Sequence, residues 1–260
     1  MKKALLLSLS FICFSLCSCK KTQSNSLLDQ IKAKGEMSIA MEGVWAPWNY
    51  HDEQNQLVGF DVDVAKEICK RMGVRAKFVE REWERVLSSL EKHECDIVMS
   101  GVEITPEREE RFYYTTPYAY EKAVVIVRKE TNDIKSFKDL NGRTSANSLN
   151  STYDDIARKS GAIAITVDTF DETISLLLQN RVDSTINSVL VYYNYMKNNS
   201  KAPIKVAAES DEICRIAIPC RRSPECVTLM LELNKTLDSM RADGTLERIS
   251  LKYFDQDVTK

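Results

Sequence analysis

The sequence predicts an α/β fold, because strand-like and helix-like segments alternate along most of the chain. Strand patterns at 36–41, 74–79 and 96–99 are separated by amphipathic helical patterns, and a second strand-and-helix series begins at 123–127. This β-α-β order is typical of an open, mostly parallel sheet with helices on both faces. At 260 residues, the chain is long enough for one large domain or two of ordinary size.

Composition excludes some classes of function. The formal net charge of -2 provides no basic field for nucleic acid. The 43% hydrophobic and 28% charged residues suit a soluble globular body. The chain has no CxxC pair, phosphate-binding loop or nucleophile elbow, and no motif places either histidine, His51 or His93. We therefore expect neither a metal nor a cofactor.

The chain begins like a secreted protein. Lys2-Lys3 precedes an apolar stretch that is too short to span a bilayer. The following Leu16-Cys17-Ser18-Cys19 resembles a bacterial lipobox, in which the last cysteine is lipidated after cleavage. We expect residues 1–18 to be a lipoprotein signal peptide, and 19–35 a tether that begins at the lipidated Cys19. An ordinary signal peptide cleaved nearby, without a lipid, is the alternative.

Two tryptophans follow predicted strands in the first half. Strand 36–41 leads into Trp45-Ala46-Pro47-Trp48, a rigid aromatic loop. Asp61 can cap the next helix, which Gly73 ends, and Trp83 begins a second amphipathic helix. Since open sheets bind ligands at the carboxyl ends of their strands, Trp45 and Trp83 could meet at one crevice.

A third strand end carries the most informative residues. The apolar strand 96–99 stops at Ser100-Gly101, where the chain can turn sharply. Thr105 then reads as a helix N-cap followed by proline, so Arg108 lies in a first helical turn, where the helix dipole does not favour a cation. A guanidinium beside a strand-end turn suits bidentate binding of a carboxylate. Ion pairing with Glu103, Glu107 or Glu109 on a solvated face is the alternative.

The second half repeats the alternation. Ser151 and Thr152 start a helix and offer hydroxyls and backbone N–H groups to an anion, although plain N-capping is the commoner use. Further strands are expected at 163–167, 182–187 and 214–219, separated by helices, and two helices close the chain at about 224–241 and 246–254.

The order of motifs resembles the solute-binding proteins, family 3, of bacterial polar amino acid ABC transporters. The matching phrases are Val58-Gly59-Phe60-Asp61-Val62-Asp63-Val64-Ala65, Ile104-Thr105-Pro106-Glu107-Arg108, Thr116-Pro117-Tyr118, Arg181-Val182-Asp183 and Arg241-Ala242-Asp243-Gly244-Thr245-Leu246. The second half is most similar to cystine-binding members, through Ser148-Leu149-Asn150-Ser151-Thr152-Tyr153. Residues 101–106 are more similar to arginine-type members.

The resemblance implies a two-lobed Venus flytrap fold, each lobe an open, mostly parallel sheet flanked by helices. Lobe one would comprise 36–122 and 218–260, lobe two 123–217, with two crossing strands between them. It also implies a monomeric binding protein, not an enzyme, that is lipid-anchored on the extracytoplasmic face of a membrane. Such a protein captures an amino acid, here cystine or a basic amino acid such as arginine, and delivers it to an ABC permease with its ATPase.

The resemblance further implies roles for individual residues. Trp45 and Trp83 would sandwich the ligand, while Ser100 and Gly101 supply hydroxyl and backbone contacts. Arg108 would bind the α-carboxylate. Thr152 would add donors from lobe two to the same carboxylate.

One position departs from the family pattern. Where members commonly carry an aspartate for the α-amino group of the ligand, this chain has Ser188. A buried ammonium group without a carboxylate is costly, so another acid must serve or the ligand must differ. Glu103 is the first candidate for this acid, and Glu42 is the second.

Two other functions stay open from the sequence. An enzyme could use the same fold, since the fold also hosts a periplasmic dehydratase of aromatic amino acid synthesis. A sensor or surface-interaction lipoprotein could use the same pocket. The five cysteines after the signal region, an odd number, leave at least one unpaired, and Cys220 and Cys226 could form a bridge.

Overall fold

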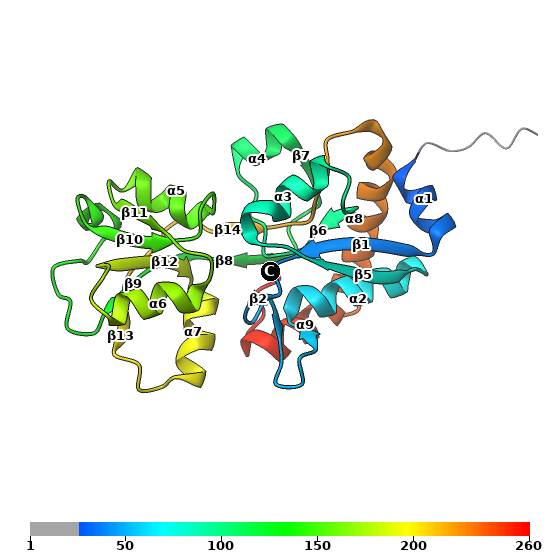
Figure 1. Ribbon diagram of the computed structural model, residues 1–260. Coiled ribbons are helices and arrows are strands. Elements are labelled where there is room, and N and C mark those ends of the chain that lie inside the picture. Colours follow the sequence, from blue (N-terminus) through cyan, green and yellow to red (C-terminus); the bar gives the residue numbers. More distant parts are fainter. Residues whose placement is uncertain (1–25) are drawn as a thin grey trace, which may run out of the picture.

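The computed structural model describes residues 26–260 as two lobes that lie side by side (Figure 1). Its α/β, two-lobed architecture confirms the predicted fold class. The predicted signal peptide, the predicted lipidation site Cys19 and the predicted tether up to residue 25 lie outside the described residues.

Lobe one is built on a three-stranded parallel sheet in the order β5-β1-β6. Its strands are β1 (Glu36–Met41), β5 (Arg75–Glu80) and β6 (Ile97–Val98). A small antiparallel sheet holds β2 (Val44–Trp45), β3 (Asn49–His51) and β4 (Leu57–Val58). The helices are α1 (Leu27–Lys34), α2 (Phe60–Met72), α3 (Trp83–Glu91), α4 (Pro106–Arg111), α8 (Val227–Ala242) and α9 (Thr245–Phe254), with a 3-10 turn at Pro224–Cys226.

Strand β1 lies between two apolar layers. Met37, Ile39 and Met41 are fully buried in the layer formed with α2, α8 and α9, whereas Ala40 packs with α3 on the opposite face. Alternate side chains of a strand point to opposite faces, so one short strand can contribute to both layers. Burial of such side chains contributes about 1.5 to 3 kcal/mol each.

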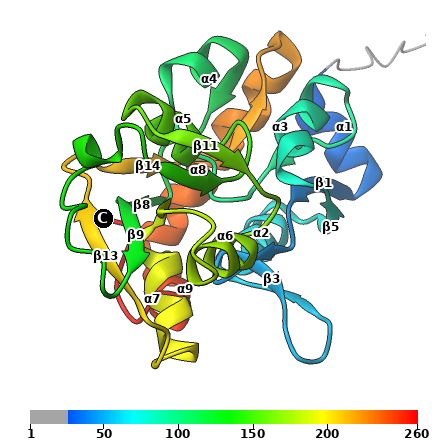
Figure 2. The same cartoon turned by 60° about the vertical axis from the view of Figure 1, so that its left-hand side comes forward.

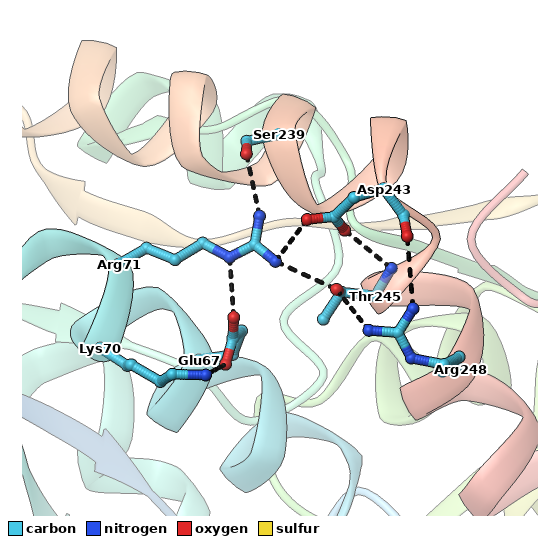
Figure 3. A network of polar contacts seen from close by, with 7 residues as sticks. All are labelled: Glu67, Lys70, Arg71, Ser239, Asp243, Thr245 and Arg248. Carbon is cyan, nitrogen blue, oxygen red and sulfur yellow. Dashed lines mark hydrogen bonds and ion pairs between the residues drawn. The ribbon is translucent and has the colours of Figure 1, made fainter.

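A polar network joins α2 to the two terminal helices (Figure 3). Arg71, at the end of α2, donates hydrogen bonds to Glu67 (2.8 Å), Ser239 (2.9 Å), Asp243 (2.8 Å) and Thr245 (3.0 Å). Three of these partners lie on or beside α8 and α9. The guanidinium therefore fixes chain segments that are about 170 residues apart in sequence, as the separations of 168 to 174 residues show.

Lobe two holds a five-stranded sheet in the order β11-β10-β12-β9-β13. Its strands are β9 (Ala123–Arg128), β10 (Thr144–Asn147), β11 (Ile163–Thr166), β12 (Ser184–Ser188) and β13 (Ile204–Glu209). Its helices are the 3-10 helix η1 (Phe137–Leu140), α5 (Thr152–Lys159), α6 (Phe170–Leu178) and α7 (Val189–Asn198). Alternate β9 residues pack on opposite sides, Val125 and Val127 with α5 and Val124 and Ile126 with α6.

The second sheet is mixed, which differs from the mostly parallel sheet expected. Strand β10 is parallel to β11 and β12, but β9 is antiparallel to both β12 and β13. The chain enters lobe two along β9 and leaves it after β13, at the side where the two lobes are connected. These two neighbouring strands therefore run in opposite directions. An apolar run such as 123–127 contains no signal for strand direction.

Two short strands connect the lobes. β8 (Ala119–Glu121) and β14 (Cys214–Ile216) pair in antiparallel fashion, with Glu121 opposite Cys214. β7 (Phe112–Tyr114) and β15 (Pro219–Arg221) form a similar pair on the lobe-one side. Lobe two is therefore an insertion that is attached by two backbone crossings.

The structure differs from the expected tether over residues 27–34, which form helix α1. Leu27 and Ile31 are buried in the lobe-one core, and Ser26 and Gly35 cap the helix. The i, i+4 spacing of Leu27 and Ile31 places both apolar side chains on one helix face, which packs near α8. Helix α2 also differs in detail, because it begins at Phe60 after Gly59, and Asp61 is a buried residue rather than its cap.

Candidate ligand-binding site

A pocket lies between the lobes, at the carboxyl ends of strands from both sheets. Lobe one contributes residues that follow β1, β5 and β6, and lobe two contributes residues that follow β10 and β11 or lie at the end of β12. The lining comprises Glu42, Val44, Trp45, Trp83, Ser100, Gly101, Glu103, Arg108 and Glu121, together with Ser148, Ser151, Thr152, Tyr153, Asp168, Thr169, Phe170 and Asn187. Seven of the eight residues predicted to bind ligand line this pocket; Ser188 does not.

The ring of Trp45 lies against the Ser100-Gly101 turn. A Cβ atom on Gly101 would lie 2.3 Å from Cζ3 of Trp45, and Gly101 has a positive φ of 55°. Trp45 also stacks on the buried Trp48, with ring centroids 5.6 Å apart. The glycine thus permits a close contact that positions an aromatic wall of the pocket.

Arg108 is buried between the lobes, with 7% of its surface exposed. Its backbone N–H donates to the N-cap Thr105 (3.2 Å), as the sequence predicts. Its guanidinium donates to the carbonyl oxygens of Glu103 in lobe one (3.2 Å) and Asn150 in lobe two (3.3 Å), and lies 5.5 Å from the ring centroid of Trp83.

The guanidinium of Arg108 has no acidic partner in the described part of the chain, where both of its hydrogen bonds go to backbone carbonyls. The alternative of an ion pair on a solvated face is therefore wrong. A buried guanidinium without a counter-charge favours an anionic group of a ligand.

The Ser100-Gly101 turn is fixed by buried Asp61. The carboxylate of Asp61 accepts hydrogen bonds from the Gly101 N–H (2.9 Å), the Tyr118 hydroxyl (2.6 Å) and the Asn49 amide (3.2 Å). Burial raises the pKa of Asp61 to about 7. The Gly101 N–H is thus engaged within the protein, whereas the Ser100 hydroxyl lies at the pocket wall and contacts Glu42 (3.4 Å).

Acidic side chains outnumber basic ones in the lining of the pocket. Glu42, Glu103, Glu121 and Asp168 line it, against Arg108 as the one basic residue in the lining. Burial raises the pKa of Glu42 to about 7, and burial likewise raises that of Glu121 to about 8. A cationic group beside these carboxyl groups stabilises their ionised form, so the lining favours a ligand that carries more than one cationic group.

Two hydroxyl residues at the start of α5 have separate tasks. Ser151 is the N-cap and accepts a hydrogen bond from the Asp154 N–H (3.0 Å), which is the plain capping use. Thr152 occupies the next position and lines the pocket.

Ser188 is fully buried at the end of β12. Its hydroxyl donates a hydrogen bond to Glu121 and accepts one from the Leu190 N–H (3.1 Å), so it caps α7. Ser188 does not line the pocket, whereas Glu121, which accepts its hydrogen bond, does.

Several lining residues were missed from the sequence. Asn187 lies in the last two residues of β12 and Asp168 follows β11, so the rule for carboxyl ends could have found them. Glu121 and Tyr153 carry no such signal, because their place depends on how β8 pairs with β14 and how α5 packs. Within residues 26–260, no group of three or more His, Cys, Asp or Glu side chains could hold a metal ion, and no helix is long and apolar enough to cross a membrane.

The five cysteines of the described chain are all buried and unpaired, Cys220 and Cys226 included. Buried thiols of this kind behave as small apolar side chains. None of them lines the pocket.

Two lobes joined by paired strands, with a polar pocket between them, define a bilobal solute-binding protein. The chain belongs to the bacterial extracellular solute-binding proteins, family 3, whose family model matches residues 37–256. Its known relatives are transport binding proteins, and the chain is a binding protein rather than an enzyme.

Three individual proteins are similar to this chain in sequence or in structure. The chain is 35% identical to the L-cystine-binding protein TcyA of Bacillus subtilis, over 100% of both chains. An ancestral arginine-binding protein bound to arginine is 30% identical, with a TM-score of 0.79 over 85% of this chain and 98% of that one. The L-cystine solute receptor of Neisseria gonorrhoeae, in its unliganded open conformation, is 30% identical, with a TM-score of 0.61 over 90% and 99% of the two chains.

Proposed function

We propose that the protein is the substrate-binding component of an ABC transporter for polar amino acids, and that its ligand is cystine or a basic amino acid such as arginine. The observation that carries this proposal is the buried guanidinium of Arg108, which faces the pocket without an acidic partner among the described residues. A carboxylate of the ligand would supply the missing negative charge.

The remaining lining residues suit the rest of such a ligand. Trp45 and Trp83 offer flat apolar surfaces, and Ser100 and Thr152 offer hydroxyls from opposite lobes. Four acidic side chains can receive ammonium or guanidinium groups. Both cystine, with its two ammonium groups, and arginine would fit this balance, in agreement with what the relatives named above bind.

Capture would proceed by closure of the lobes. The ligand would first meet lobe one, at Arg108, Ser100 and the tryptophans, after which lobe two would close over it. Ligand contacts that exist only when both lobes meet would shift the population toward the closed form. The lobes already touch at the hydrogen bond of Arg108 to Asn150 and at the ion pair of Lys197 with Asp255 (2.8 Å), where α7 approaches α9 (Figure 2).

The proposal includes the setting of the protein. We propose that Cys19 carries a lipid anchor, that the protein works on the extracytoplasmic face of a membrane, and that its closed form docks on a permease with an ATPase. Lobe one would span 36–122 and 218–260 together with α1, and lobe two 123–217. The family, whose members are extracellular, supports this setting.

A thermal-shift screen of refolded, ligand-free protein against the twenty amino acids, cystine and ornithine tests the ligand class. A ligand that binds only the folded state raises the melting temperature. Cystine or a basic amino acid should give the largest shift. A screen in which no amino acid raises the melting temperature would overturn the proposed function.

The Arg108→Ala substitution tests the binding mode. It leaves the ligand carboxylate without its charged partner, so the affinity measured by calorimetry should fall by about a hundredfold or more. Arg111→Ala is the matched control, since Arg111 is exposed and pairs with Glu91. Equal affinities of the two variants would refute the role of Arg108.

A further inference from the structure

Glu121 is a buried carboxylate to which the proposed binding mode assigns no specific role. It ends β8, the first hinge strand, and only 6% of its surface is exposed. Its oxygen atoms accept hydrogen bonds from the Tyr153 hydroxyl (2.9 Å) and the Ser188 hydroxyl. Both donors belong to lobe two, so the carboxylate lies where the hinge meets that lobe.

The partners of Glu121 are uncharged. Its two hydrogen-bond donors are hydroxyl groups, two further acids, Glu103 and Asp61, raise its pKa, and among residues 26–260 it forms no ion pair within 4.0 Å. Its neighbour Lys122 points elsewhere and pairs with Glu209 (2.8 Å). Burial therefore raises the pKa of Glu121 to about 8. Because a buried carboxylate needs an opposite charge to be stable in ionised form, the site is incomplete in the protein alone.

Glu121 lies beside a position at which the family pattern has an acidic residue and this chain has none. Position 188 carries serine where an acid for the ligand's amino group was expected. The Ser188 hydroxyl donates directly to Glu121, and Glu121, unlike Ser188, lines the pocket. The hinge strand thus supplies a carboxylate to the place that residue 188 leaves without one.

The other acidic residues are less well placed for this task. Glu42 contacts Ser100 in lobe one, and Glu103 pairs through its backbone with Ile216 while its carboxyl accepts a hydrogen bond from the Cys214 thiol. Neither is held by hydroxyl groups of both α5 and β12, as Glu121 is. Two fixed donors orient the oxygen atoms of Glu121 before a ligand arrives.

We propose that Glu121 receives the α-ammonium group of the bound amino acid, with Ser188 and Tyr153 as positioning residues that hold its carboxylate. This inference rests on the proposed function. It replaces Glu103, the first candidate from the sequence, by a residue of the hinge. The ammonium group would then contact β8 and the carboxylate on the same α-carbon would contact Arg108 in lobe one. A ligand bound in this way would link the hinge strand to both lobes.

Calorimetry with two pairs of probes tests the assignment. L-arginine is compared with 5-guanidinopentanoic acid, and L-cystine with 3,3′-dithiodipropionic acid; each second compound lacks the α-amino groups. Glu121→Gln keeps the shape of the side chain and removes its charge. It should lower the affinity for the amino acid by about tenfold or more and change that for the deaminated compound by less than about twofold.

The controls separate a direct contact from a structural role. Glu107→Gln, at an exposed position on α4, should leave both affinities unchanged. Glu121→Gln that weakens both members of a pair equally would show a structural role and overturn the assignment. The assignment would also fail if Glu103→Gln, rather than Glu121→Gln, lost the preference for the amino acid.

The test also separates this inference from the proposed function. If the unaltered protein binds the amino acid but Glu121→Gln binds it equally well, the Glu121 assignment fails and the proposed function stands. If the unaltered protein binds neither L-arginine nor L-cystine, that ligand class is wrong, and the Glu121 assignment fails with it.

Discussion

Gly101 shows how one residue without a side chain shapes the binding site. Its turn follows β6, its N–H is fixed by Asp61, and the ring of Trp45 lies against its Cα. A glycine tolerates both the positive φ and the close ring contact, which any larger residue would disturb.

A Gly101→Ala substitution should therefore affect stability and binding together. The added methyl group meets Trp45 at 2.3 Å and must displace the ring. We expect the free energy of unfolding in urea to fall by about 1 to 3 kcal/mol, and the affinity for L-arginine or L-cystine to fall by about tenfold.

Gly142→Ala is the matched control for this prediction. Gly142 also has a positive φ, 74°, but a Cβ there would meet no atom within 4 Å. It should lose only the backbone term of about 1 kcal/mol and keep its affinity. Equal affinities of the two variants would show that the Trp45 contact is irrelevant to binding.

At the residue scale, the sequence predicts several lobe-one residues that line the pocket. Arg108, Ser100 and the two tryptophans follow strands, and a strand end marks a ligand crevice without knowledge of tertiary structure. Glu121 could not be predicted in this way. Its exposure to the pocket depends on pairing with Cys214, which is 93 residues away by number, and on the packing of α5.

At the scale of elements, α2, α8 and α9 depend on a single side chain for part of their arrangement. Arg71 makes four hydrogen bonds across these helices, and a side chain of this kind loses little entropy per bond. None of the residues of this network lines the pocket.

Arg71→Ala should lower the free energy of unfolding by about 2 kcal/mol, because it removes several charge-assisted hydrogen bonds from a partly buried site. Ligand affinity should not change. Lys70→Ala is the control: Lys70 pairs with Glu67 on the surface, with 77% of its side chain exposed, and its loss should cost at most about 0.5 kcal/mol. Chemical unfolding in urea measures both. A similar loss in the two variants would contradict a role for the network.

The element order is largely predictable, but direction and packing are not. Alternation of strands and helices follows from local periodicity, and caps such as Thr105 and Thr169 mark helix starts. The antiparallel direction of β9 and the docking of α1 depend on contacts with distant segments, which no local pattern encodes.

At the scale of the whole molecule, buried acids give the ligand-free protein a pH-dependent stability. Glu42, Asp61 and Glu121 have pKa values raised to about 7, 7 and 8 by burial. The unfolded chain has ordinary carboxyl groups, which ionise at lower pH. As the pH rises through the folded values, the folded protein must ionise buried groups that the unfolded chain has already ionised, so stability falls.

We therefore expect the melting temperature of the ligand-free protein to decrease between about pH 5 and about pH 8, measured by circular dichroism. Glu121→Gln removes one of the raised groups and should reduce the decrease. A bound cationic ligand should also reduce it, because it stabilises the ionised carboxylates. A melting temperature that rises across this range would contradict the prediction.

The place of α1 has a practical consequence. Its first turn is anchored to the lobe-one core at Leu27 and Ile31, at the end of the molecule remote from the hinge strands (Figure 1). A linker or fluorophore attached just before Ser26 would be connected to lobe one only. The protein could therefore be immobilised on a sensor chip while lobe two stays free to move.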